Sequence, residues 1–155
     1  MKKLIAYFSP SGNTKAMAEK LAKATGADWF EIKPQTPYTR ADLDWTNKNS
    51  RSSVEMNDKS YRPQIARLPN SLANYDTIFI GFPIWWYVAP TIINTFVENV
   101  DLDGKKVIPF ATSGGSGMGK TLANLKPSCP GANWVEGKVI NGMSEKALAD
   151  WAEKL

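Results

Sequence analysis

The chain has 155 residues, is 43% hydrophobic and carries a formal net charge of +4, with no histidine and a single cysteine, Cys129. This length and hydrophobicity suit one globular domain over residues 1–155 and argue against a disordered chain. The absence of histidine excludes His-dependent catalysis and most zinc sites, and a single cysteine excludes an internal disulfide. Because no apolar run approaches the roughly 20 residues that span a bilayer, we expect a cytoplasmic protein with no membrane partner.

Short apolar runs rich in β-forming residues predict the strands of a sheet. They lie at residues 4–8, 77–82, 107–111 and 134–140, with a weaker run at 28–32. The runs at 4–8, 77–82 and 107–111 are nearly continuous rather than alternating, as expected of parallel strands that are covered on both faces.

Segments with the apolar spacing of helices separate these strands. They lie at residues 14–25, 93–100 and 148–155 and around Leu122 and Leu125. Gly26, Pro90 and Ser144 stand where a helix end, a first helical turn and an N-cap are expected. The alternation of strands and helices predicts a three-layer α/β/α domain built on a parallel sheet.

Residues 33–75 are too many for a plain connection between two strands. We expect a short helix at 39–45, capped by Thr39, and an ordered surface excursion without periodicity at 50–63. Most of the excess positive charge lies here, at Lys48, Arg51, Lys59, Arg62 and Arg67. These basic residues neither cluster tightly nor interleave with aromatic residues, so we expect no nucleic-acid partner.

Ligands of open α/β sheets bind beyond the carboxyl ends of the strands, so the loops after three apolar strands carry the functional prediction. Loop 1 (residues 9–14) precedes the first helix and contains Ser9, Ser11, Gly12, Asn13 and Thr14. Hydroxyl and amide groups ahead of a helix N-terminus favour a phosphate site, although the sequence fits neither a Walker loop nor G-x-G-x-x-G. The alternative is a turn in which Asn13 or Thr14 only caps the helix.

Loop 2 (residues 83–90) is bounded by prolines and holds three adjacent aromatic residues. It contains Pro83, Ile84, Trp85, Trp86 and Tyr87. Three neighbouring aromatic side chains cannot all point into one core, and exposed ones indicate a binding surface for a flat ligand. The alternative is that a tryptophan only covers the end of the sheet, which we expect for at least one of the pair.

Loop 3 (residues 112–119) is rich in glycine and small hydroxyl residues. It contains Thr112, Ser113, Gly114, Gly115 and Gly117. Its glycines allow the backbone itself to donate and accept hydrogen bonds at the edge of a ligand ring. The alternative is a flexible connection to the following helix.

Together the three loops predict a single ligand, with a phosphate at loop 1, a planar ring at loop 2 and polar ring edges at loop 3. None of the loops supplies an acid, a base or a thiol. We therefore predict no catalytic side chain and expect the ligand to supply the reactivity. Flavin mononucleotide (FMN) satisfies each of these conditions.

The sequence resembles the flavodoxin family, and specifically its small, short-chain branch. The resemblance rests on Ser9-x-Ser11-Gly12-Asn13-Thr14 and on residues 81–86 and 109–117, and it runs through essentially the whole chain. It implies a flavodoxin-like fold with a five-stranded sheet of order 2-1-3-4-5 and an uninterrupted fifth strand. It also implies non-covalent FMN bound by loops 1, 2 and 3.

Two features depart from the family pattern. Pro10 has no N–H, so loop 1 offers one backbone donor fewer. Carrier flavodoxins are strongly acidic, whereas loops 1, 2 and 3 of this chain contain no Asp or Glu. A carboxylate missing at about 8 Å corresponds to about 2 kcal/mol at an effective dielectric of 20, or about 90 mV for one electron. We therefore predict that bound FMN is less strongly reducing here than in an acidic carrier.

The resemblance implies a redox role, with two alternatives. The chain is either an electron carrier that docks on a redox partner protein or an oxidoreductase that passes electrons from NAD(P)H to a small quinone-like acceptor. In the second case the rim of loop 2 and residues 38–62 would hold the second substrate, and Arg51, Lys59 or Arg62 would attract a phosphate. A non-redox nucleotide- or partner-binding module remains a further alternative. A phospho-accepting receiver domain is excluded, because Gly81 and its neighbours stand where its aspartate is required.

Overall fold

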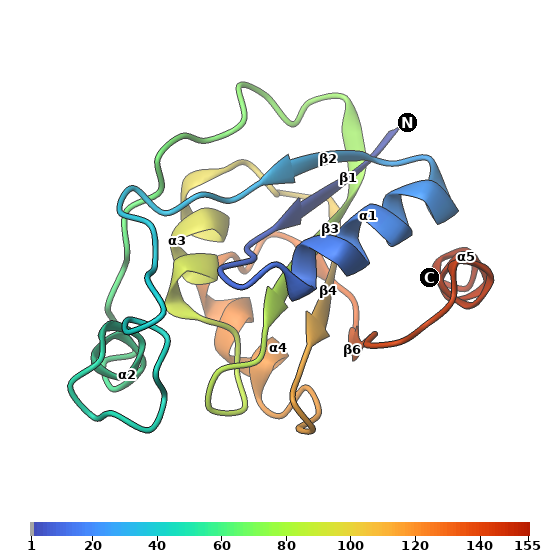
Figure 1. Ribbon diagram of the computed structural model, residues 1–155. Coiled ribbons are helices and arrows are strands. Elements are labelled where there is room, and N and C mark those ends of the chain that lie inside the picture. The colour runs from blue at the N-terminus through green and yellow to red at the C-terminus, as the bar shows by residue number, and fades with distance from the viewer. Residues whose placement is uncertain (1) are drawn as a thin grey trace.

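The computed structural model describes residues 2–155, which form a parallel β-sheet with helices on both faces (Figure 1). The strands are β1 (Lys2–Tyr7), β2 (Asp28–Glu31), β3 (Tyr75–Pro83), β4 (Lys106–Thr112), β5 (Asn133–Trp134) and β6 (Lys138–Val139). They pair in the order β2-β1-β3-β4-β5, and β6 pairs with β4 further along the same edge as β5. The predicted α/β fold with strand order 2-1-3-4-5 is confirmed.

The helices pack on the sheet in two layers. Two of their ends, at Gly26 and Ser144, are as predicted, whereas Pro90 is the N-cap of α3 and not part of its first turn. On one face lie α1 (Asn13–Thr25) and α5 (Glu145–Glu153), and on the other lie α3 (Thr91–Asn99), α4 (Thr121–Leu125) and a one-turn 3-10 helix (Lys126–Ser128). Gly26 ends α1 in the left-handed conformation, and the Ser144 hydroxyl accepts a hydrogen bond from the Ala147 N–H at the start of α5. Within residues 2–155, no helix is both long and apolar enough to cross a membrane.

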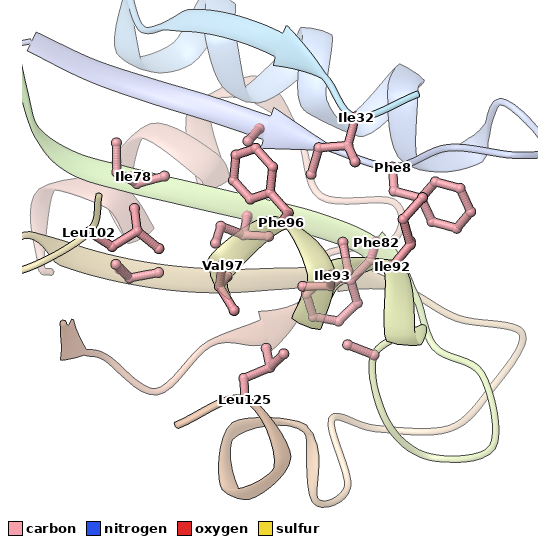
Figure 2. Close-up of a cluster of buried hydrophobic side chains, with 14 of the residues drawn as sticks. Phe8, Ile32, Ile78, Phe82, Ile92, Ile93, Phe96, Val97, Leu102 and Leu125 are labelled. Carbon is pink, nitrogen blue, oxygen red and sulfur yellow. The ribbon is translucent and has the colours of Figure 1, made fainter. Parts of the chain in front are cut away.

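The central strands are almost completely buried, as their continuous apolar runs predict. Successive side chains of β3 alternate between two hydrophobic clusters, with Ile78 and Ile80 on the α3 face and Phe79 on the face covered by α1 and α5. Figure 2 shows the first cluster, in which Ile93 and Phe96 of α3 lie against the sheet. This packing on both faces holds the carboxyl ends of β1, β3 and β4 side by side.

The expectation of an uninterrupted fifth strand is wrong. Two short strands, β5 and β6, stand in its place, and the register against β4 shifts by one residue between them. Val107 and Ala111 of β4 direct their carbonyl groups toward this edge. Pro109 has the same orientation but no N–H to donate, so the ladder is broken opposite it. Gly137 fits the resulting bulge, because a Cβ there would lie 1.7 Å from the Pro109 carbonyl oxygen.

The predicted helix at 39–45 is also wrong, because these residues form only turns. The expected cap is present: the Thr39 N–H donates to the Asp42 carboxylate, and the Asp42 N–H donates to the Thr39 hydroxyl. The chain leaves the helical path soon afterwards, where the Asp44 carboxylate accepts the N–H of Thr46 in a tight turn.

The excursion predicted at 50–63 contains a helix that the sequence pattern did not reveal. This helix, α2 (Arg51–Met56), begins after Ser50, whose hydroxyl accepts the N–H of Ser53. Its six residues are too few for a helical period to appear in the sequence. In Figure 1, α2 lies apart from the sheet, in the long connection from β2 to β3.

Candidate functional site

The three loops that follow β1, β3 and β4 meet at Thr112, the last residue of β4. The Thr112 hydroxyl is hydrogen-bonded to the buried hydroxyl of Thr14 in loop 1, at 2.8 Å. Its carbonyl oxygen accepts the backbone N–H of Ile84 in loop 2, at 2.9 Å. Figure 1 shows loops 2 and 3 leaving the same edge of the sheet. The structure therefore brings together the three segments that carry the predicted site residues.

Loop 1 leaves the N-terminal end of α1 open to solvent. Gly12 turns the chain into the helix with a φ of 92°, a left-handed conformation that favours glycine, and no side chain of residues 2–155 other than that of Ser9 caps the helix. The Ser9 hydroxyl accepts a backbone N–H of the first turn. The exposed side chains of Ser11 and Asn13 have no hydrogen-bond partner in the described chain. Capping by Asn13 or Thr14 is thus excluded, and an open helix N-terminus suited to an anion remains.

Loop 2 is a tight hairpin that displays two aromatic side chains. Trp85 and Val88 exchange backbone hydrogen bonds of 2.9 and 3.2 Å across Trp86 and Tyr87. The two central residues have φ values of 50° and 69°, in a turn type that favours Asn and Gly. Each bulky residue held there costs about 1 kcal/mol or more. Because their side chains are 45% and 68% exposed, burial does not offset this strain, and strained positions of this kind cluster at ligand-binding sites.

Trp85 belongs to the core beneath the hairpin. Its ring meets Phe8 and Tyr38 edge to face, each at a centroid distance of 5.7 Å. The prediction that at least one tryptophan of the pair covers the end of the sheet is confirmed. The contact with Tyr38 also joins the β2–β3 connection to loop 2.

A buried polar cluster holds Tyr38 in this position. Its hydroxyl donates to Glu55 of α2, which is 2% exposed. Arg51 pairs with the same carboxylate at 3.0 Å, and its guanidinium lies 3.7 Å from the centre of the Tyr38 ring. Burial and the hydrogen bond to Glu55 raise the pKa of Tyr38 well above its usual range. Sequence reasoning missed this cluster, because its members lie in a segment without periodicity.

Loop 3 is fixed at its second residue by Asn141, which follows β6. The Asn141 side chain accepts the Ser113 N–H at 2.8 Å and donates to the Ser113 carbonyl oxygen at 2.9 Å. The Ser113 hydroxyl in turn accepts the N–H of Gly115. Gly114, Gly115 and Gly117 are exposed, so their backbone is accessible to a ligand. Asn141 was not predicted, although its place just beyond the fifth strand position marks it as a strand-end residue.

A cleft of about 930 Å³ lies between loop 1 and the turns at residues 39–45. Besides Ser11 and Tyr38, its walls include Arg40, Asp44 and Trp45. Arg40 brings a positive charge beside loop 1, and Trp45, which is 73% exposed, brings a flat apolar surface. No spacing in the sequence places Arg40 there, because tertiary contacts set the path of this irregular connection.

Two of the three basic residues considered for a nucleotide phosphate already have acidic partners. Arg51 pairs with Glu55, and Arg62 makes two hydrogen bonds to the Glu98 carboxylate, at 2.8 and 3.1 Å. The hydrogen bond from Arg62 holds the pKa of the Glu98 carboxyl below its usual range. Lys59 has no ion-pair partner among the residues that the structure describes.

The family of the chain follows from its comparison with known proteins. The model of the flavodoxin family matches residues 2–155. The chain belongs to the flavodoxin family. Among solved flavodoxin-like structures, it is similar to a candidate flavoprotein from Bacteroides eggerthii DSM 20697, with 53% identity, coverage of 99% of this chain and 96% of that chain, and a TM-score of 0.94.

Two further relatives have descriptions that mention a cofactor or a reaction class. It is similar to a flavoprotein from Lactobacillus acidophilus NCFM solved in complex with FMN, with 27% identity, coverage of 88% and 91% of the two chains, and a TM-score of 0.69. It is also 28% identical over 98 residues to YcaK of Escherichia coli K12, described as an uncharacterised NAD(P)H oxidoreductase. That match covers 63% of this chain and 45% of YcaK, so the chain spans less than half the length of this relative.

Proposed function

We propose that this flavodoxin-family chain binds FMN at loops 1, 2 and 3 and uses it for redox chemistry. The observation that carries the proposal is the convergence of the loops on Thr112, whose hydroxyl bonds to loop 1 and whose carbonyl bonds to loop 2. An open helix N-terminus, a displayed aromatic pair and an exposed glycine backbone thus lie around one strand end. The Lactobacillus acidophilus relative, solved with FMN, supports the same cofactor.

The residues of the site fit the two chemically different parts of FMN. The phosphate would accept hydrogen bonds from the open N–H groups of α1 and from Ser11 and Asn13, and Arg40 would add a positive charge. The ring system would lie against Trp86 and Tyr87, with its polar edge bonded to the backbone of loop 3.

Bound FMN would supply the electron-transferring chemistry that no side chain of these loops provides. The part of the protein is to bind the cofactor, orient it and set its electrostatic surroundings. Loops 1, 2 and 3 carry no acidic residue, and Asp44 lies on the wall of the cleft beside loop 1. Since little negative charge opposes an electron added to the ring, we expect a less strongly reducing flavin than in an acidic carrier of the family.

We further propose that the chain is an oxidoreductase that uses NAD(P)H to reduce a small quinone-like acceptor. In the balanced reaction, NAD(P)H and one proton reduce a quinone to its hydroquinone and leave NAD(P)⁺. The likeness to an NAD(P)H oxidoreductase and the net charge of +4 support this role over that of a carrier for a partner protein.

Anaerobic stopped-flow mixing of the FMN-loaded protein with NADPH tests the proposal. Prompt loss of the flavin absorbance is the expected result. A flavin that loses its absorbance only after a separate reductase is added would show a carrier instead. A protein that takes up no FMN from excess would contradict both roles and leave a non-redox nucleotide- or partner-binding module.

A further inference from the structure

A second cavity, of about 690 Å³, lies between loop 2, the beginning of α3, α4 and the segment that follows α2. Of the residues proposed to hold FMN, only Trp86 and Tyr87 line it. Its volume lies within the range of small-molecule sites, which is about 300–1,000 Å³. The cavity lies between the rim of loop 2 and residues 56–62, where the sequence predicts that an oxidoreductase would hold its second substrate, and FMN itself does not fill it.

The wall of the cavity is largely apolar and includes two aromatic side chains. Met56, Ala89 and Leu125 form apolar parts of its wall. Trp86 and Tyr87, which the strained hairpin of loop 2 holds largely exposed, add two aromatic rings. Aromatic side chains pack best against other flat ring systems, so this lining favours a planar apolar ligand.

The charges on the wall are of one sign. Lys59 and Lys120 line the cavity, and neither has an ion-pair partner within residues 2–155. Arg62 also lines it but is held by Glu98. Among the described residues, no Asp or Glu contributes to the wall. A cavity with two uncompensated lysines and no carboxylate attracts an anionic group.

Thr91 adds a polar group that lacks a partner. It lies on the wall of the cavity at the start of α3 and is 6% exposed. In the part of the chain that the structure describes, its hydroxyl is the one buried side-chain polar atom without a hydrogen bond. Buried hydroxyls are nearly always hydrogen-bonded, so this unpaired hydroxyl marks a polar group behind the cavity wall that the described chain leaves unsatisfied.

We propose that this cavity binds an aryl carboxylate, with its rings against Trp86 and Tyr87 and its carboxylate near Lys59 and Lys120. The site goes beyond the FMN function, because its wall is complete without the cofactor and its ligand is of a different chemical class. The aryl carboxylate and the flavin ring would both contact the hairpin of loop 2. The two ligands can therefore be bound at the same time only if they lie on opposite sides of this hairpin.

Calorimetric titration of the FMN-loaded protein with 2-naphthoate tests this proposal, with uncharged 2-naphthamide as the matched ligand. We expect one naphthoate per chain, clearly weaker binding of the amide, and an unchanged amount of bound FMN. If the protein takes up no FMN, the same titration on the protein as purified still tests the cavity, so failure of one proposal is not failure of the other.

Variants then locate the site. Lys59→Gln with Lys120→Gln should weaken naphthoate binding by about tenfold, and Ala123→Trp, on an exposed wall position of α4, should abolish it. Lys23→Gln, at the exposed end of α1, is the control and should change nothing. No binding of naphthoate, equal binding of the amide, an equal loss in the control, or release of FMN by naphthoate would each overturn the proposal.

Discussion

Loops 1 and 2 flank the same strand end, yet the chain builds them in opposite ways. Loop 1 places glycine at its left-handed position, Gly12, and leaves polar groups open at the end of a long helix. Loop 2 places Trp86 and Tyr87 in left-handed positions that would suit Asn and Gly. Loop 1 is therefore built with little strain, whereas loop 2 gives up stability to display two aromatic rings.

The two loops also differ in what supports them from below. Loop 1 is held to β4 by the hydrogen bond between the buried hydroxyls of Thr14 and Thr112, and its Ser9 hydroxyl accepts a backbone N–H of α1. Loop 2 rests on Trp85, which packs on Tyr38, and Tyr38 is held by Glu55 of α2. We therefore expect loop 1 to determine the affinity for the phosphate, and loop 2 and its support to determine the contact with the ring.

The largest expected effect comes from removing the open polar side chains of loop 1. In the double variant Ser11→Ala and Asn13→Ala, two hydrogen bonds to a charged phosphate would be lost, so FMN should bind about 100-fold more weakly. Riboflavin, which has no phosphate, should bind as it does to the unchanged protein. Flavin fluorescence titrations measure both affinities. An equal loss for the two flavins would mean that these side chains do not bind the phosphate.

The next largest effect is expected from a carboxylate placed in loop 3, which tests how charge alone changes the potential of the flavin. Gly114 is exposed, and a Cβ there would have nothing within 4 Å, so Gly114→Asp should fold normally. A carboxylate at about 8 Å from the ring should lower the midpoint potential of bound FMN by about 90 mV. Gly114→Asn is the uncharged control for anaerobic potentiometry. Equal potentials for the two variants would contradict the electrostatic part of the account.

Removing the strain from the hairpin of loop 2 should make the protein more stable and its flavin binding weaker. The double variant Trp86→Asn and Tyr87→Gly gives the turn its favoured residues, so the free energy of unfolding should rise by about 1 kcal/mol. FMN and riboflavin should both bind about tenfold more weakly, since the aromatic contacts are gone. Denaturant unfolding and the two flavin titrations provide the measurements. Unchanged flavin affinity would remove loop 2 from the site.

The smallest expected effect is on stability, and it comes from the hydrogen bond between Tyr38 and Glu55 that supports loop 2. Because the folded state raises the pKa of Tyr38, its stabilising bond to Glu55 is fully present below pH about 10 and is lost as the pH rises further. Tyr38→Phe should lower the free energy of unfolding by about 1 kcal/mol near neutral pH and by less at alkaline pH. The exposed Tyr61→Phe is the control. A difference that stays constant up to alkaline pH would contradict this role of Tyr38.

The sequence was sufficient to predict the framework, because local chemistry and burial agree there. The continuous apolar runs of β1, β3 and β4 and the end residues Gly26 and Ser144 gave the elements, and the strand ends located the three loops. The two errors arose where a partner strand or a local turn decided the outcome. Pro109 leaves its own strand β4 intact but interrupts the pairing of β4 with the fifth strand, which is therefore divided into β5 and β6. At residues 39–45, the turn at Asp44 ends the helical path that begins at Thr39.

The parts of the site that were missed depend on contacts between distant residues. Asn141 fixes loop 3 across 28 positions of sequence, and Glu55 reaches Tyr38 across 17. Arg40 reaches loop 1 only through the path of the β2–β3 connection. No period or short pattern marks such pairs, because each residue alone is typical of an exposed polar segment.

If the three loops joined at Thr112 form one FMN site, the amount of FMN that the protein retains should show it. Protein incubated with excess FMN and then separated from free flavin should carry one FMN per chain, visible in its absorption spectrum. Riboflavin treated in the same way should be retained less, because it lacks the phosphate that loop 1 holds. Protein that emerges colourless from the FMN incubation would contradict the account.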